Sequence, residues 1–190
     1  MKKIIQSYTK KLNATLNQDA IHKTSILGDA LLFAWKNGNC IYFCGNGGSA
    51  GNAIHLANDF LYGAGKRNGG GLRVEALSAN AAVITCLAND IGYENIYSEQ
   101  LKVKARAGDV LIALSGSGNS PNIVKALEVG NSMGMTTFAI LGFSGGKSKA
   151  LAKHPIHFEI DDMQIAEDLQ LIIGHMCMKW LSEQSLSLGS

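Results

Sequence analysis

The sequence is short of several residue types, and each shortage excludes a class of protein. Only two of the 190 residues are proline, aromatic residues make up 7%, and no apolar run approaches the length of a membrane span, about 20 residues. The four cysteines lack the CxxC pairing of zinc ribbons and redox motifs. A net charge of +2 leaves no basic arm for nucleic acid. We therefore expect a protein that binds neither membranes nor nucleic acid directly.

The composition that is present favours one α/β domain. Hydrophobic residues make up 46% of the chain, enough for a sizeable core, and 22 glycines suit a fold with many tight turns. The N-terminus soon meets polar residues and has no hydrophobic signal core, so we expect a cytoplasmic protein with reduced cysteines. Residues 1–36 read as a helical segment of the same domain, and residues 37–190 as its main body.

A first glycine-rich loop follows the apolar run at residues 40–44. It reads Gly45-Asn46-Gly47-Gly48-Ser49 and leads into a helix-like segment, which predicts strand, tight loop and helix. Its glycines allow close backbone approach, and Ser49 stands where an N-cap would, so the loop predicts an anion site. His55 and Asp59 are four residues apart and fall on one face of that helix.

A second loop follows the apolar run at residues 109–114. It reads Ser115-Gly116-Ser117-Gly118-Asn119-Ser120, and Pro121 suits the first turn of a helix. Hydroxyls and N–H groups at a helix start can cradle a phosphate, although turn chemistry alone also explains the pattern, and the lack of lysine argues against a nucleotide P-loop. Lys66 and Arg67, in the glycine-rich segment 63–71, can reach an anion or simply lie in a solvated loop.

Fully apolar strands that alternate with helices predict a doubly wound parallel sheet. We expect strands at 40–45, 72–77, 109–114, 136–141 and 157–160. Two helices, divided near residue 18, precede the first strand, and others are expected over 80–88, 97–105, 121–133 and 163–183. A turn is expected at 89–94 and a loop at 142–147. Because ligands bind at the carboxyl ends of such strands, both loops should lie at the functional edge of the sheet.

The chain resembles the sugar isomerase (SIS) domain family, and within it the phosphoheptose isomerases. The resemblance is carried by the first loop with His55, by Asn89-Asp90-Ile91-Gly92-Tyr93, by the second loop, and by His175. It implies a flavodoxin-like five-stranded parallel sheet and a homotetramer with sites between subunits. The implied reaction converts sedoheptulose 7-phosphate to D-glycero-D-manno-heptose 7-phosphate through an enediol, in bacterial lipopolysaccharide or capsule heptose biosynthesis.

The resemblance also implies roles for individual residues. Asn46 and Ser49 would contact the sugar chain, and Ser115, Ser117 and Ser120 would hold the phosphate. The remaining positions of the implied substrate site are Gly47, Gly48, Gly116, Asn89 and Asp90. A metal, usually zinc in this family, would be held by His55, Asp59, Glu167 and His175.

Three positions depart from the family pattern. Asp59 stands where the family has Glu, Glu167 where it commonly has Gln, and Gly63 where it has Arg. For catalysis, Asp59 or Glu167 would move a proton between neighbouring carbons, and His175 would exchange one with the adjacent oxygen. Two alternatives remain at this point: an isomerase of another sugar phosphate, and a non-catalytic binding or regulatory protein like the family member that associates with the replication initiator DnaA.

Overall fold

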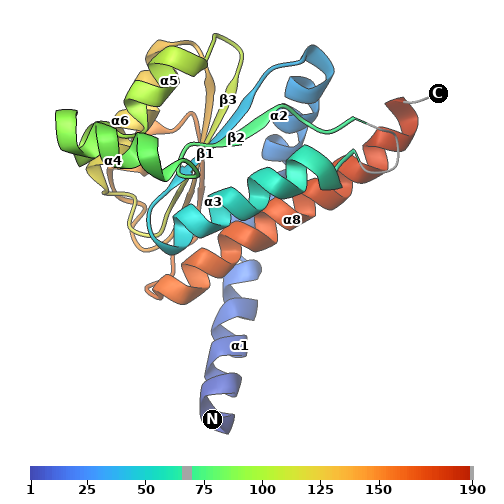
Figure 1. Ribbon diagram of the computed structural model, residues 1–190. Coiled ribbons are helices and arrows are strands. Elements are labelled where there is room, and N and C mark those ends of the chain that lie inside the picture. The colour runs from blue at the N-terminus through green and yellow to red at the C-terminus, as the bar shows by residue number, and fades with distance from the viewer. Residues whose placement is uncertain (66–69, 189–190) are drawn as a thin grey trace.

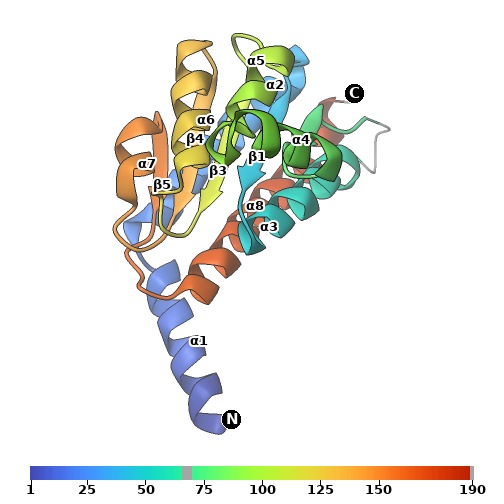
Figure 2. The same cartoon turned by 60° about the vertical axis from the view of Figure 1, so that its left-hand side comes forward.

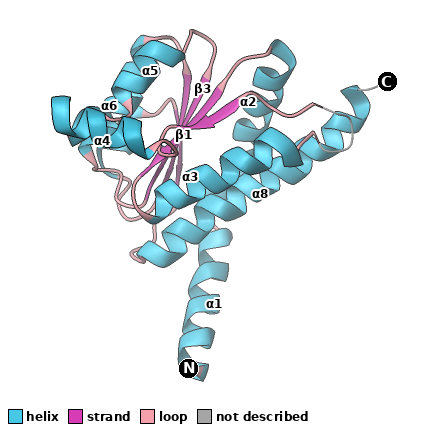
Figure 3. Cartoon of the chain, in the orientation of Figure 1, coloured by secondary structure: helices cyan, strands magenta, loops and turns pink. Residues whose placement is uncertain are grey.

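The computed structural model describes residues 1–65 and 70–188, so Lys66 and Arg67 lie outside the described residues. Within the described residues, five parallel strands form one sheet in the order β2-β1-β3-β4-β5. The sheet lies between helices on its two sides (Figures 1 and 3). The strands are β1 Ile41–Gly45, β2 Val74–Ala76, β3 Val110–Ser115, β4 Thr136–Leu141 and β5 His154–His157. This is the flavodoxin-like strand order, and it confirms the predicted fold class.

Both faces of the sheet are buried, which explains why the central strands are apolar throughout. Every residue of β1 and β3 is buried. Phe43 and Ile112 pack in one core, whereas their neighbours Cys44 and Ala113 pack in the core on the other face. The register pairs Gly45 with Leu114, so the two predicted loops leave the sheet side by side.

The helices cover both faces of the sheet. On one face, α3 and α8 lie side by side in both views (Figures 1 and 2). Among the described residues, no helix combines the length and the apolar composition of a membrane span. The α-helices are α1 Lys2–Leu16, α2 Thr24–Asn37, α3 Gly48–Asn58, α4 Ala81–Ile91, α5 Ser98–Lys104, α6 Pro121–Ser132, α7 Gly146–Leu151 and α8 Met163–Leu188, and the shorter turns are η1 Asp19–Lys23, η2 Asp59–Gly63 and η3 Tyr93–Asn95.

Three expectations about local structure were wrong. The fifth strand ends at His157, because residues 154–157 pair with β4 and the chain then turns so that the Ile160 carbonyl accepts a hydrogen bond from Phe143 N–H. Asn89 and Asp90 belong to α4, which continues to Ile91, rather than to a turn. The expected loop at 142–147 gives way to α7 at Gly146.

Helix α1 projects from the body of the molecule (Figures 1 and 2). The Tyr8 hydroxyl donates to Asp168 of α8, and Lys11 Nζ lies 3.1 Å from Asp162 Oδ2. Burial, followed by the hydrogen bond to Asp168, raises the pKa of Tyr8 to about 12, so its phenol stays protonated and donates. Nearer the N-terminus, Ile4 and Ile5 are 66% and 55% exposed, which leaves an apolar surface on this helix uncovered.

Candidate active site

The first loop turns directly from β1 into α3. A Cβ added at Gly45 would lie 2.5 Å from the Ser49 carbonyl oxygen, and Gly47 caps the helix with φ +55°, so both positions require glycine. Ser49 is therefore inside the first turn and is not the N-cap that the sequence suggested. Its buried hydroxyl accepts a hydrogen bond from Gln170 Nε2 at 3.0 Å. The Ala50 N–H of this turn donates to the Gly47 carbonyl at 3.1 Å, so an anion at this helix start would use the N–H groups of Gly48 and Ser49.

Asn46 is fixed by a reciprocal pair of amide hydrogen bonds. Its Nδ2 donates to Asn122 Oδ1 and its Oδ1 accepts from Asn122 Nδ2, both at 2.8 Å. The Tyr93 hydroxyl also donates to Asn46 Oδ1 at 3.1 Å, whereas the Tyr97 hydroxyl donates to the Gly45 carbonyl and lies 3.3 Å from Asn46 Oδ1. Asn122 is 1% exposed and was missed in the sequence, where the only signal was an amide directly after the loop proline. This pair joins the first loop to the start of α6.

The second loop faces the first across a cavity of about 260 Å³. Ser115 Oγ accepts from Gly118 N–H at 3.0 Å, whereas the hydroxyl of Ser120, the N-cap of α6, makes no capping hydrogen bond. The cavity is lined by Asn46, Gly47, Gly48, Ser49, Leu114, Ser115, Ser120, Met163 and Glu167. The structure thus brings six of the expected binding residues together, while Gly116 and Ser117 belong to the loop but not to the cavity lining.

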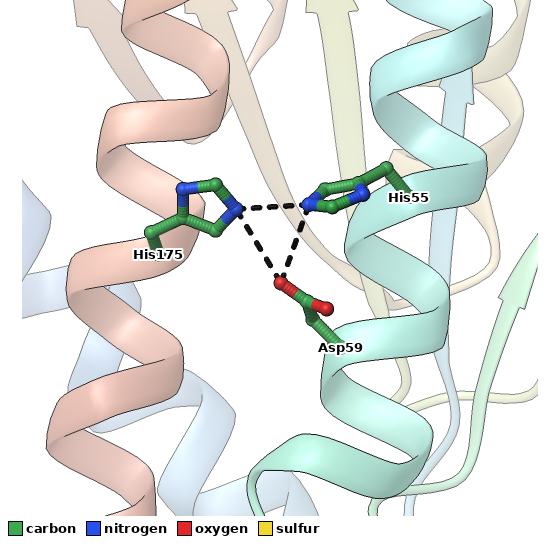
Figure 4. Close-up of side chains that lie close together, drawn as sticks. All are labelled: His55, Asp59 and His175. Carbon is green, nitrogen blue, oxygen red and sulfur yellow. Dashed lines mark hydrogen bonds and ion pairs between the residues drawn. The ribbon is translucent and has the colours of Figure 1, made fainter.

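A second cluster lies farther along α3 and α8, where His55, Asp59 and His175 point toward one another (Figure 4). The Nε2 atoms of the two histidines are 2.9 Å apart, and Asp59 Oδ2 lies 3.4 Å from each of them. Asp59 opens the π-helical turn that continues α3. All three side chains are partly exposed, so the cluster is open to a ligand.

This cluster has the donor set and spacing of a metal site. Two imidazoles and a carboxylate suit zinc, and ligands of a tetrahedral zinc ion, each about 2.0–2.1 Å from it, lie about 3.3–3.4 Å from one another. The observed separations of 2.9 and 3.4 Å are close to that spacing.

Glu167 does not join the three residues with which the sequence grouped it. Its carboxylate lies against Gly48, where an added Cβ would collide with it, and it lines the cavity between the loops. Eight residues along α8 separate Glu167 from His175, a rise of about 12 Å. Between the two, Asn52 Nδ2 donates to Gln170 Oε1 at 2.9 Å and to the Glu167 carbonyl at 3.0 Å, which fixes α3 against α8.

Asn89 and Asp90 stand apart from both clusters. Both are exposed on α4, where Asn89 Nδ2 donates to Asp90 Oδ1 at 2.8 Å, and neither lines the cavity. The hydrogen bond and the charge of Asp90 raise the pKa of the nearby Cys86 thiol. Tyr93, which follows α4, contacts the first loop through its hydrogen bond to Asn46.

Comparison with known proteins agrees with this geometry. The SIS domain model matches residues 4–142. A phosphoheptose isomerase from Akkermansia muciniphila is 41% identical over 141 residues, 74% of each chain, and one from Geotalea daltonii is 34% identical over 92% of this chain and 91% of its own.

Solved structures show the same fold. The phosphoheptose isomerase GmhA from Neisseria gonorrhoeae aligns with a TM-score of 0.87 at 24% identity, over 96% of this chain and 98% of its own. One from Francisella tularensis aligns with a TM-score of 0.88 at 23% identity, over 96% and 97%. The chain therefore belongs to the SIS domain family, and its relatives there include the phosphoheptose isomerases.

Proposed function

We propose that this protein is a phosphoheptose isomerase, which converts sedoheptulose 7-phosphate to D-glycero-D-manno-heptose 7-phosphate through an enediol. One observation carries the proposal: the cavity between the two loops and the cluster of His55, Asp59 and His175 both lie along the paired helices α3 and α8. The chain is also 33–41% identical to proteins named phosphoheptose isomerase. The product would supply heptose for lipopolysaccharide or capsule in a bacterium.

The distance between the cavity and the cluster of His55, Asp59 and His175 suits a seven-carbon substrate. Gly48 at the cavity and His55 in the cluster are seven residues apart on α3, a rise of about 10 Å. An extended chain of eight bonds from C1 to phosphorus spans about 10 Å, at about 1.2 Å per bond. A phosphate held by Ser115 and Ser120 therefore leaves C1 and C2 beside His55, Asp59 and His175.

The cluster contains groups for the proton transfers that this isomerisation requires. A base must remove a proton from C1 and return it to C2, while the hydroxyl proton leaves O1 and a proton is gained at O2. Asp59 Oδ2 faces the histidines, which leaves Oδ1 for the carbon-bound proton. In the metal-free site, His175 exchanges a proton with the oxygens. Glu167, beside Gly48, lines the cavity with Ser115 and Ser120 and therefore lies away from C1 and C2.

Zinc is part of the proposal, with His55, Asp59 and His175 as its ligands. When bound there, zinc supplies a Lewis acid that polarises the substrate carbonyl. Support comes from the separation of the three ligand atoms, which all lie within 4.8 Å of one another. Glu167 is available as a further ligand only if its side chain leaves Gly48.

We further propose a homotetramer in the cytoplasm. Support for assembly comes from the projecting helix α1 with its exposed Ile4 and Ile5, and from the exposed Phe33 on α2. Support for the compartment comes from the four cysteines, which are all free. Size measurement in solution tests the assembly directly.

Turnover of sedoheptulose 7-phosphate by the purified protein tests the function. We expect aldose product, seen by separation of the heptose phosphates, and solvent deuterium at C2 of the product because an enediol exchanges its proton with water. Activity should fall on chelation and return with zinc. Turnover of a pentulose or hexulose phosphate, but not of the heptulose phosphate, would show that the substrate is a shorter sugar phosphate. If none of these compounds is turned over, with or without zinc, the assignment as an enzyme is wrong.

The Ser120→Ala variant tests the phosphate end of the site. Loss of a hydroxyl that hydrogen-bonds a charged phosphate should raise KM about tenfold or more and leave kcat nearly unchanged. Steady-state kinetics measure both constants. Ser132→Ala, at the other end of α6, is the matched control and should behave as wild type, because its hydroxyl bonds only to the Val129 carbonyl. An unchanged KM in Ser120→Ala would remove this residue from the site.

A further inference from the structure

The loop between β4 and α7 contains a strained residue. Among the described residues, Phe143 is the only non-glycine residue with a positive φ, at 45°. A bulky aromatic residue rarely adopts this left-handed conformation, because its Cβ crowds the backbone. Such strain persists only where the surrounding structure holds it, and it often marks a functional position.

Two hydrogen bonds hold Phe143 in this conformation. His157, the last residue of β5, donates from Nε2 to the Phe143 carbonyl at 2.8 Å. The Phe143 N–H donates to the Ile160 carbonyl at 2.9 Å. Both backbone groups of the strained residue are therefore tied to the segment that follows β4 in the sheet, and His157 is the only side chain in this arrangement.

The loop between β4 and α7 also binds two backbone carbonyls of the second loop and so fixes the orientation of those peptide groups. Gly142 N–H donates to the Gly116 carbonyl, and Ser148 N–H, in the first turn of α7, donates to the Gly118 carbonyl, each at 2.9 Å. In a planar trans peptide the C=O and N–H groups point in opposite directions. Because the Gly116 carbonyl points toward Gly142, the N–H of Ser117 points away from it.

The loop between β4 and α7 packs closely against the glycines of the second loop. A Cβ added at Gly116 would lie 2.5 Å from the Met163 sulfur and 3.8 Å from the Phe143 ring. A Cβ at Gly118 would collide with the Gly145 carbonyl. The ring of Phe143 thus lies near Gly116, and the N–H of the neighbouring Gly142 holds the Gly116 carbonyl, so the position of Phe143 is coupled to that of the second loop.

We infer that His157 and Phe143 are positioning residues for phosphate binding: His157 holds the strained Phe143, and the β4–α7 loop thereby fixes the second loop, whose Ser115 and Ser120 line the cavity. Neither residue touches the phosphate in this arrangement. The inference rests on the proposed role of the second loop in phosphate binding, and it assigns a function to His157.

Calorimetric titration with inorganic phosphate and steady-state kinetics test this inference on the purified protein. His157→Ala should weaken phosphate binding about five- to tenfold and raise KM by a similar factor, with kcat changed less than about twofold. His157→Gln places an amide N–H near the position of Nε2 and should restore most of both constants. A general loss of structure would not give this split or this rescue.

His154→Ala is the matched control, because His154 lies on the same strand but stacks on Phe138 instead of contacting the loop. It should leave phosphate binding unchanged. If His157→Ala does not fold, Phe143→Gly provides the test: glycine accepts the positive φ but removes the ring, and KM should again rise while kcat holds.

Unchanged phosphate affinity in His157→Ala, or a loss that His157→Gln does not rescue, would overturn the inference. So would a wild-type protein that does not bind phosphate. A wild-type protein that binds phosphate but does not turn over the heptulose phosphate would instead refute the proposed function, and the phosphate constants of the variants would still decide the role of His157.

Discussion

The His175→Ala variant is expected to lose turnover of sedoheptulose 7-phosphate by about 10²–10⁴-fold while remaining folded. His175 Nε2 lies 2.9 Å from His55 Nε2 and 3.4 Å from Asp59 Oδ2, so its removal takes away both a proton-transfer group and a metal ligand. Its side chain is 43% exposed and makes little of the core, so the midpoint of thermal unfolding should shift by only a few degrees.

The measurement pairs kinetics with metal content, because the two roles of His175 predict different results. If the residue acts chiefly as a ligand, the variant should bind less zinc than wild type and regain part of its activity at high zinc concentration. Lys179→Ala, one turn farther along α8 and exposed, is the matched control and should behave as wild type. Wild-type turnover in His175→Ala would remove the cluster from the mechanism.

The fold could be predicted from the sequence because the patterns that mark its strands and helix starts are local. Continuous apolar runs at 40–44 and 109–114 predicted strands buried on both faces, and the loops that follow them predicted helix starts. Where the signal was weak, the prediction was wrong. The edge strand β5 contains Pro155 and partly exposed histidines, so pattern alone did not place its end.

The site was only partly accessible, because helical spacing does not fix where long side chains point. The i, i+4 spacing of His55 and Asp59 placed them on one face, and only the family resemblance grouped them with His175 and Glu167 of α8. In the structure His175 lies with them, whereas the Glu167 carboxylate lies at Gly48. That contact depends on a glycine without a side chain on the neighbouring helix, which no pattern within α8 indicates.

The residues that hold the site residues in place were even harder to predict from the sequence. Asn122, which fixes Asn46, and Gln170, which joins α8 to α3, are amides buried by tertiary packing, and Asn52, the partner of Gln170, is half-buried. Nothing in their local sequence distinguishes them from other amides. Likewise, the strain at Phe143 comes from hydrogen bonds to His157 and Ile160, which follow it in the chain by 14 and 17 residues.

The two carboxylates of the site should give opposite kinetic results when each is replaced by its amide. Asp59→Asn is expected to lower kcat by about 10²–10⁴-fold, because an amide cannot accept the proton from C1. Glu167→Gln should change KM more than kcat, because Glu167 lies beside Gly48 in the cavity at the phosphate end of the site, away from the reacting carbons. Solvent deuterium exchange into the substrate measures proton removal separately from the full turnover.

Asp168→Asn is the control for substitution on α8, since Asp168 accepts the hydrogen bond of Tyr8 and has no contact with the cavity. Metal content must be measured for Asp59→Asn, because the amide also weakens a metal ligand. If exchange is lost although zinc is retained at the wild-type level, Asp59 is the base. If instead Glu167→Gln loses exchange and Asp59→Asn keeps it, the carboxylate at Gly48 must move toward the histidines during the reaction, and the assignment of the base passes to Glu167.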